Sequence, residues 1–139
     1  MTKLEKTYET INKEKIEVMN KTLRNQTTNA FICYYDKNYC IILDKSKCNN
    51  SIEENIVLME ELGHYYTNSL YKPYNNSTLI GKMEYRAKKW QINALVPLEE
   101  LRKHIGASIY ELADIFNVTA EFIIKTLNFY EERGLLLEY

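Results

Sequence analysis

The sequence lacks features that would mark several large classes of protein. Its 139 residues carry 18 basic and 19 acidic side chains, so no overall field favours nucleic acid or an anionic membrane surface. Apolar runs such as residues 56–59 are far too short to span a bilayer. The charged N-terminal segment has no apolar stretch typical of a signal peptide. We therefore expect a cytoplasmic protein that contacts neither membrane nor nucleic acid directly.

Cysteine is also scarce, with only Cys33, Cys40 and Cys48. An odd number of cysteines without an export signal favours reduced thiols in the cytoplasm. Their spacings match no common zinc finger or ribbon, so a zinc site built on them is a minor alternative.

The length and a hydrophobic content of 45% suit one compact domain. We predict a single α+β domain over 1–139 in which helices dominate, with 1–96 as its core and 97–139 as a C-terminal helical subdomain. Residues 16–23 fit either a helix or a strand. The other predicted elements are a helix over 2–14, a hairpin of 30–35 and 39–43, a helix over 52–69, a loop over 71–81, a helix over 82–95 and three short helices after Pro97.

Local signals support these boundaries. Residues 36–38 form a turn sequence between the two strands. Ser51, with Glu54 three residues later, makes a capping box before the long helix. Ser108 and Thr119 are suited to cap the last two helices.

Chemically, the most informative place is the middle of the predicted helix over 52–69. Glu60 and His64 are four residues apart and share one face, which can present two ligands to one metal. Glu61 is rotated by about 100° from Glu60, so it can approach a water at the metal without being a ligand. By spacing alone, such a pair more often faces solvent. The preceding apolar run instead favours burial, and buried carboxylates need a cationic or hydrogen-bonding partner.

The next predicted helix offers a third ligand, Glu84. It falls on one stripe with Ala87, Gln91 and Ala94, and the small Ala87 allows another helix to approach closely. Taken alone, a glutamate among basic residues is more often a surface ion-pair partner, here of Arg86 or a neighbouring lysine. Glu84 is a candidate ligand only in combination with Glu60 and His64.

Four segments in order resemble the ImmA/IrrE family of metallopeptidases. The segments are Glu60-Glu61-Leu62-Gly63-His64, similar to HExxH; Glu84-Tyr85-Arg86-Ala87-Lys88-Lys89-Trp90, similar to ExxAxx[FW]; Leu95-Val96-Pro97-Leu98; and the segment 110–119. The resemblance covers residues 30–135 and implies a zincin-like fold. It also implies that His64 and Glu84 are ligands and that Glu61 is the general base of peptide hydrolysis.

One position departs from the family pattern, because Glu60 stands where the family has histidine. A carboxylate is a competent zinc ligand, so the resemblance still implies a site of Glu60, His64 and Glu84. A harder donor set favours manganese or iron as alternatives to zinc. The oxyanion donor stays open among Tyr65, Tyr66, Tyr71 and Tyr74.

The resemblance also implies a partner, because such peptidases of phages and mobile elements cleave a transcriptional repressor. The strand 39–43 is expected at the sheet edge, where an extended substrate can pair with it. Two alternatives remain: an inactive interaction module that keeps the peptidase fold, and a DNA-binding regulator, since 109–134 resembles a helix-turn-helix. The segment 97–139 has four basic and eight acidic side chains, which disfavours DNA binding.

Overall fold

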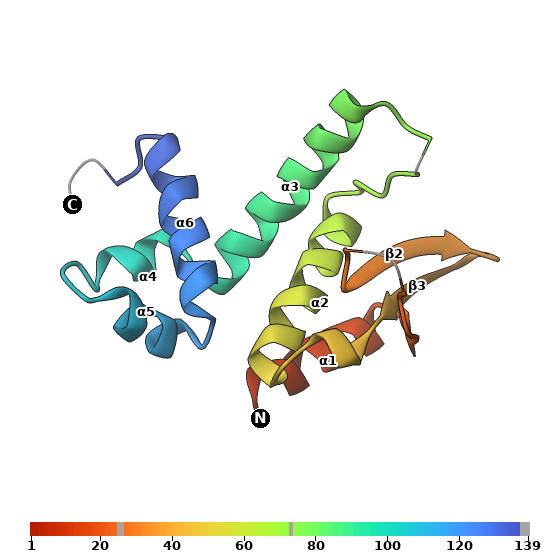
Figure 1. Ribbon diagram of the computed structural model, residues 1–139, viewed down its shortest axis with the longest axis horizontal. Helices are drawn as coiled ribbons and strands as arrows, with labels where there is room; N and C mark the ends of the chain where they lie inside the picture. The colour runs from red at the N-terminus through yellow and green to blue at the C-terminus, as the bar shows by residue number, and fades with distance from the viewer. Residues whose placement is uncertain (25–26, 73, 137–139) are drawn as a thin grey trace. The chain divides into compact units, whose positions relative to one another are not determined.

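In the computed structural model, which describes residues 1–24, 27–72 and 74–136, the chain is α+β, as predicted (Figure 1). It forms two compact units, Met1–Gln91 and Ile92–Tyr139. The elements of the first unit are α1 (Lys3–Lys13), β1 (Glu17–Asn20), β2 (Ala30–Tyr35), β3 (Asn38–Leu43), the short 3-10 helix η1 (Lys45–Lys47), α2 (Ser51–Tyr66) and most of α3 (Ser77–Leu95). None of the helices in the described ranges has the length and apolar character needed to cross a bilayer.

The sheet has three strands in the order β1-β3-β2. β2 and β3 form the predicted hairpin, whose two-residue turn places Asp36 and Lys37 at φ 49° and 66°. This left-handed pair matches the twist of the strands, and it lets Asn38 begin β3 rather than end the turn. The segment left open between helix and strand contributes β1, which pairs with β3 in parallel. The expectation that 39–43 lies at the sheet edge is therefore wrong, because β1 and β2 occupy its two sides.

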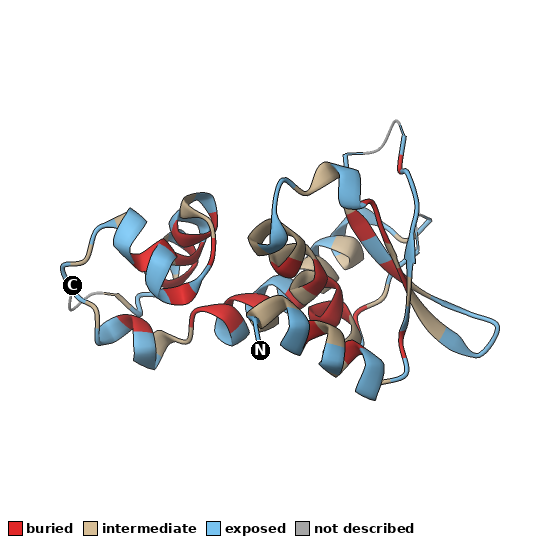
Figure 2. Ribbon diagram, turned by 90° about the horizontal axis from the view of Figure 1, so that it is seen from below, coloured by how far each residue is buried: buried red, intermediate tan, exposed pale blue. Residues whose placement is uncertain are grey.

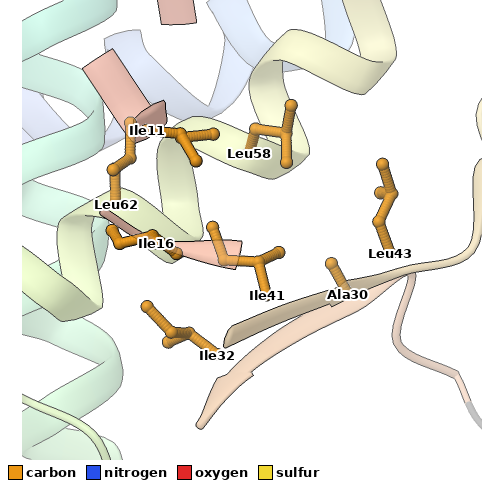
Figure 3. Packing of buried hydrophobic residues seen from close by; sticks show 8 residues of the cluster. All are labelled: Ile11, Ile16, Ala30, Ile32, Ile41, Leu43, Leu58 and Leu62. Carbon is orange, nitrogen blue, oxygen red and sulfur yellow. The ribbon is translucent and has the colours of Figure 1, made fainter. Parts of the chain in front are cut away.

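One face of this sheet packs against α2 and α1. Alternation places Ala30, Ile32, Ile41 and Leu43 on the inner face, where they meet Leu58 and Leu62 of α2 (Figure 3). Ile11 of α1 and Ile16 complete this buried cluster. The buried positions of these elements accordingly face one another, while their outer surfaces are exposed (Figure 2). The core therefore fixes α2 against β2.

α2 follows the prediction with shifted ends. Its N-cap is Asn50, whose side chain accepts from the backbone N–H of Glu53 at 3.0 Å, so the predicted capping box at Ser51 is wrong by one residue. The helix ends at Tyr66 rather than at residue 69, because Asn68 adopts φ 51° and reverses the chain. Left-handed geometry of this kind is tolerated by asparagine better than by most residues.

α3 begins earlier than predicted. Asn76 accepts from the backbone N–H of Leu79 at 2.8 Å, so the helix starts at Ser77 instead of Lys82. Gly81 consequently lies inside α3, and the loop predicted over 71–81 ends before Ser77. A side chain at Gly81 would meet nothing within 4 Å, so this glycine interrupts no packing.

The second unit contains α4 (Leu98–Arg102), α5 (Ile109–Phe116) and α6 (Ala120–Glu132). The predicted caps are confirmed, since Ser108 accepts from Glu111 and Thr119 from Phe122, each at 3.1 Å. Between α5 and α6, Asn117 takes φ 55°, giving the tight turn of a helix-turn-helix. The unit has its own apolar core, formed by Leu101, Leu112, Phe116, Val118, Phe122, Ile123, Phe129 and Tyr130.

Candidate metal centre

The site begins on the C-terminal half of α2. Glu61 and His64 are buried, with exposed fractions of 6% and 5%, and Glu60 is half-buried. Since Glu60 and His64 are separated by four residues, they lie on the same helical face. Glu61 instead turns toward β2, where the backbone N–H of Ile32 donates a hydrogen bond to its carboxylate. The two adjacent glutamates thus have different surroundings.

α3 supplies Glu84 because it packs unusually close to α2. A Cβ atom added to Gly63 would lie 2.5 Å from the carbonyl oxygen of Ala87, so the contact requires glycine. One turn further along α3, the side chain of Gln91 donates to the carbonyl of Ile56 at 2.7 Å. Of the predicted stripe, Ala87 and Gln91 are buried at this contact, whereas Ala94 is exposed.

These two helices bring Glu60, His64 and Glu84 together. One donor atom from each lies within 4.8 Å of the others, and the closest pair is His64 Nε2 and Glu84 Oε1 at 3.5 Å. A divalent ion with bonds of about 2.1 Å holds neighbouring ligand atoms roughly 3–4 Å apart. Small side-chain rotations therefore suffice for all three groups to bind one ion.

The orientation of His64 also suits a ligand. Its Nδ1 lies 3.0 Å from the carbonyl oxygen of Ser69, which can only accept, so Nδ1 carries the proton and Nε2 faces Glu84. A metal-ligating histidine is commonly fixed in this way by a carbonyl on its other nitrogen. The chain reversal at Asn68 brings Ser69 back to His64, with the Ser69 N–H donating to the His64 carbonyl at 2.9 Å.

Ser69 was missed by the sequence analysis, which extended the helix through it. The available signal was the run Thr67-Asn68-Ser69 after an apolar helical segment, since clustered polar residues of this kind often end a helix.

Of the four candidate tyrosines, Tyr71 lies at the site. Its hydroxyl donates to Glu84 Oε1, and its ring centroid is 5.8 Å from that of His64. Tyr65 instead donates to Glu14 at 2.8 Å, and Tyr66 stacks on Trp90. Tyr74 is largely exposed.

The electrostatics of the site are those of a cluster of carboxylates around one cation. Burial raises the pKa of Glu61 to about 8, and the nearby Glu60 and Glu84 add to the increase. Burial lowers the pKa of His64, but the hydrogen bond to Glu84 and the carbonyl of Ser69 outweigh it and raise the value to about 9. The hydrogen bond to His64 in turn lowers the pKa of Glu84. The positive charge of protonated His64 therefore balances the carboxylates, as a bound metal ion would. The donor set of two carboxylates and one imidazole fits a divalent ion.

Beside these carboxylates is a polar cavity of about 230 Å³. It lies between the start of β2 and the face of α2, and it is lined by Thr27, Thr28, Asn29, Ala30, Val57, Glu60 and Glu61. Because Glu60 and Glu61 both line it, this cavity gives water and small groups access to the site.

A family model described as the IrrE N-terminal-like domain of peptidases matches residues 5–128. No significant match was found among curated proteins or among solved structures. The matched range contains both helices that supply the site.

Proposed function

Because the chain belongs to the IrrE N-terminal-like family of peptidases, we propose that it is a metal-dependent endopeptidase. Glu60, His64 and Glu84 hold one divalent ion, and Glu61 is the general base. The observation that carries the proposal is the convergence of three possible ligand side chains from α2 and α3 beside a third, buried carboxylate, that of Glu61.

The ion supplies Lewis acidity at the scissile carbonyl and makes a water molecule more acidic. Glu61 takes the proton of the attacking water and passes it to the leaving amine. The N–H of Ile32 holds its carboxylate in place, and burial makes that carboxylate a stronger base than an exposed glutamate. A divalent ion held by Glu60, His64 and Glu84 would favour the ionised form of Glu61, the form that can accept a proton.

Tyr71 is the proposed donor to the developing oxyanion. Its hydroxyl already lies at the ligand Glu84, so it can donate to a neighbouring oxygen as negative charge builds up there. Preorganised donors of this kind commonly contribute about 10²–10³ in rate.

The ion itself is proposed to be zinc, with manganese or iron as the alternatives. Two carboxylates and one imidazole form a harder donor set than two imidazoles and one carboxylate. This donor set reduces the preference of the site for zinc over manganese or iron.

The substrate is proposed to be a protein segment in extended conformation, cut in a cytoplasmic transcriptional repressor of a phage or mobile element. Because β3 is the central strand, the edge strand proposed to pair with the substrate is β2. β2 is on the side of the sheet next to Glu61, because its Ile32 N–H already points to that carboxylate. A substrate strand paired with β2 would bring its backbone close to the base.

The test is Glu61→Gln, compared with His64→Ala. The amide cannot accept the proton, so we expect cleavage of the partner to fall by about 10²–10⁴ while one ion per chain is retained. His64→Ala should lose both the ion and cleavage. Metal content is measured by elemental analysis after dialysis, and cleavage by gel and mass spectrometry.

The outcomes separate the alternatives. Undiminished turnover by the Glu61→Gln protein would refute Glu61 as the base. A parent protein that binds the ion and the repressor but never cleaves it would be an inactive interaction module. Tight, salt-sensitive binding to duplex DNA would instead favour the regulator.

A further inference from the structure

Two of the three cysteines face each other across the hairpin. Cys33 of β2 and Cys40 of β3 are directly opposite in the antiparallel register. Directly opposed residues in such a pair have Cα atoms about 4.5–5.5 Å apart, and their side chains project from the same face of the sheet. This spacing lies within the range of roughly 4.4–6.8 Å seen for disulfides.

Both thiols are accessible for reaction. Their neighbours Ile32 and Ile41 point into the core, so Cys33 and Cys40 point to the outer face, where each is half-buried. Phe31 and Met19 on the same face are exposed.

We propose that Cys33 and Cys40 are a reversible oxidation site, at which a peroxide converts the two thiols into a cross-strand disulfide. One thiolate attacks the peroxide, gives a sulfenic acid and releases hydroxide. The second thiol then displaces the sulfenic oxygen as water and closes the S–S bond. The two sulfur atoms are oxidised, and the peroxide oxygens are reduced.

The order of the two steps follows from the surroundings. Burial raises the pKa of Cys40, with contributions from Cys33 and Glu17. Cys40 is therefore less suited to attack the peroxide and is assigned the second step. A half-exposed disulfide in a sheet is of the labile kind that common thiol reductants reopen.

The oxidation site is one residue from the backbone N–H that supports Glu61, and its effect on activity rests on the proposed role of Glu61 as the base. Cys33 follows Ile32, whose N–H holds Glu61. A covalent bond between β2 and β3 restricts the motion of the strand that carries this N–H. The oxidation state of the hairpin is thereby transmitted to the position of Glu61.

The test uses the full-length protein, exposed to graded hydrogen peroxide and alkylated before digestion with trypsin. Because Lys37 separates the two cysteines, cleavage places Cys33 in the peptide 25–37 and Cys40 in the peptide 38–45. We expect a disulfide-linked pair of these peptides that dithiothreitol separates. The matched control is Cys48→Ser, which should keep the linked pair, whereas Cys33→Ser should lose it.

A second readout is amide hydrogen exchange. In the oxidised parent protein the amides of 31–42 should exchange several-fold more slowly than in the reduced protein, and the Cys33→Ser protein should show no such change. The proposal is overturned if peroxide yields only sulfinic or sulfonic acids, dimers linked between chains or disulfides that contain Cys48. A linked pair without slower exchange at Ile32 would overturn the transmission to Glu61.

Discussion

At the scale of single residues, the site depends on two neighbouring glutamates with different roles. Glu60 faces His64 and Glu84, where a cation can balance its charge. Glu61 is buried against β2 and receives one backbone N–H. The rotation between consecutive helical residues separates the proposed ligand Glu60 from the proposed base Glu61, so the two carboxylates would not compete for one ion.

The protonation of the metal-free site predicts a pH dependence of stability. The pKa values of His64 and Glu61 are raised in the folded state, to about 9 from 6.5 and to about 8 from 4.5. Between about pH 5 and about pH 9, the folded protein therefore binds more protons at these two groups than the unfolded chain does. Its free energy of unfolding consequently falls as pH rises through this range. Thermal unfolding with chelator present, measured across this range, should show the decline.

The matched control is the double variant Glu61→Gln with His64→Gln, which removes both titrating groups and should flatten the profile. Added metal should also reduce the decline in the parent protein, because the ion replaces the bound protons. An equally steep decline in the double variant would show that other groups cause it.

The proposed ligands and base on α2 could be suggested from the sequence because their spacing is local. Glu60, Glu61 and His64 lie within about one turn of helix, where geometry follows from the helical repeat. The supports of these residues were not predictable. Ile32 and Ser69 act through a backbone N–H and a carbonyl, which every residue except proline can offer. Only the fold determines which of these groups arrives at the site.

At the scale of elements, the contact between α2 and α3 sets the width of the site. Gly63→Ala should destabilise the protein by about 1–3 kcal/mol, because the added carbon overlaps the carbonyl of Ala87 and forces the helices apart. Helix propensity alone would favour alanine by about 1 kcal/mol, so packing decides the sign. The same separation should weaken metal binding by moving Glu84 from His64.

Gly81→Ala is the control for this prediction. Gly81 lies in α3 with nothing within 4 Å of an added Cβ, so here propensity acts alone and stability should rise by up to about 1 kcal/mol. Chemical unfolding and metal titration of both variants measure the effects. Equal behaviour of the two variants would contradict the packing argument.

In the second unit, α6 contains a buried hydroxyl with an unmet hydrogen bond. Thr126 is fully buried, and within the described ranges its Oγ1 has no partner. Thr126→Val removes the unsatisfied hydroxyl at nearly constant shape, so we expect stabilisation by about 1 kcal/mol. Urea unfolding tests this expectation, with Thr10→Val on α1 as comparison, because the half-buried Thr10 hydroxyl donates to the carbonyl of Lys6 at 3.1 Å and its removal should not stabilise the protein. A loss of stability in the Thr126→Val protein would indicate a hydrogen bond at Thr126.

The sheet order was the main error of the sequence analysis at this scale. Parallel pairing of β1 with β3 joins residues more than 20 positions apart, and periodicity within a segment carries no information about such partners. The hairpin was predictable because its turn and both strands are contiguous. The edge strand depended on β1, a four-residue strand too short to be identified by its pattern.

At the scale of the whole molecule, the second unit is proposed to bind the folded part of the partner. Its acidic charge disfavours DNA, and several apolar side chains are exposed on it, including Tyr110 at 76% and Ile124 at 45%. Tyr110→Ala combined with Ile124→Ala should lower kcat/KM for the intact partner by roughly 10-fold or more, as expected for loss of interface anchors.

Hydrolysis of a short peptide from the cut site should be unchanged in the same variant, and metal content likewise. Activity on that peptide should be low in every form, because binding energy from a remote site is missing. Deletion of residues from Ser108 onward should reproduce the loss on the intact partner. An unchanged rate on the intact partner in both variants would show that specificity lies elsewhere.

The close approach of Gly63 to Ala87 has a consequence for related sequences. This pair is required by the packing of two helices, whereas Glu61 is proposed to serve the reaction. A descendant that loses peptidase activity but keeps the fold is free to replace Glu61, while its glycine and alanine stay under the same steric constraint. The glycine and alanine would therefore indicate common descent, and the glutamate would indicate retained peptidase activity. Sequences that keep the small pair but lack the glutamate are where binding proteins derived from this family should be sought.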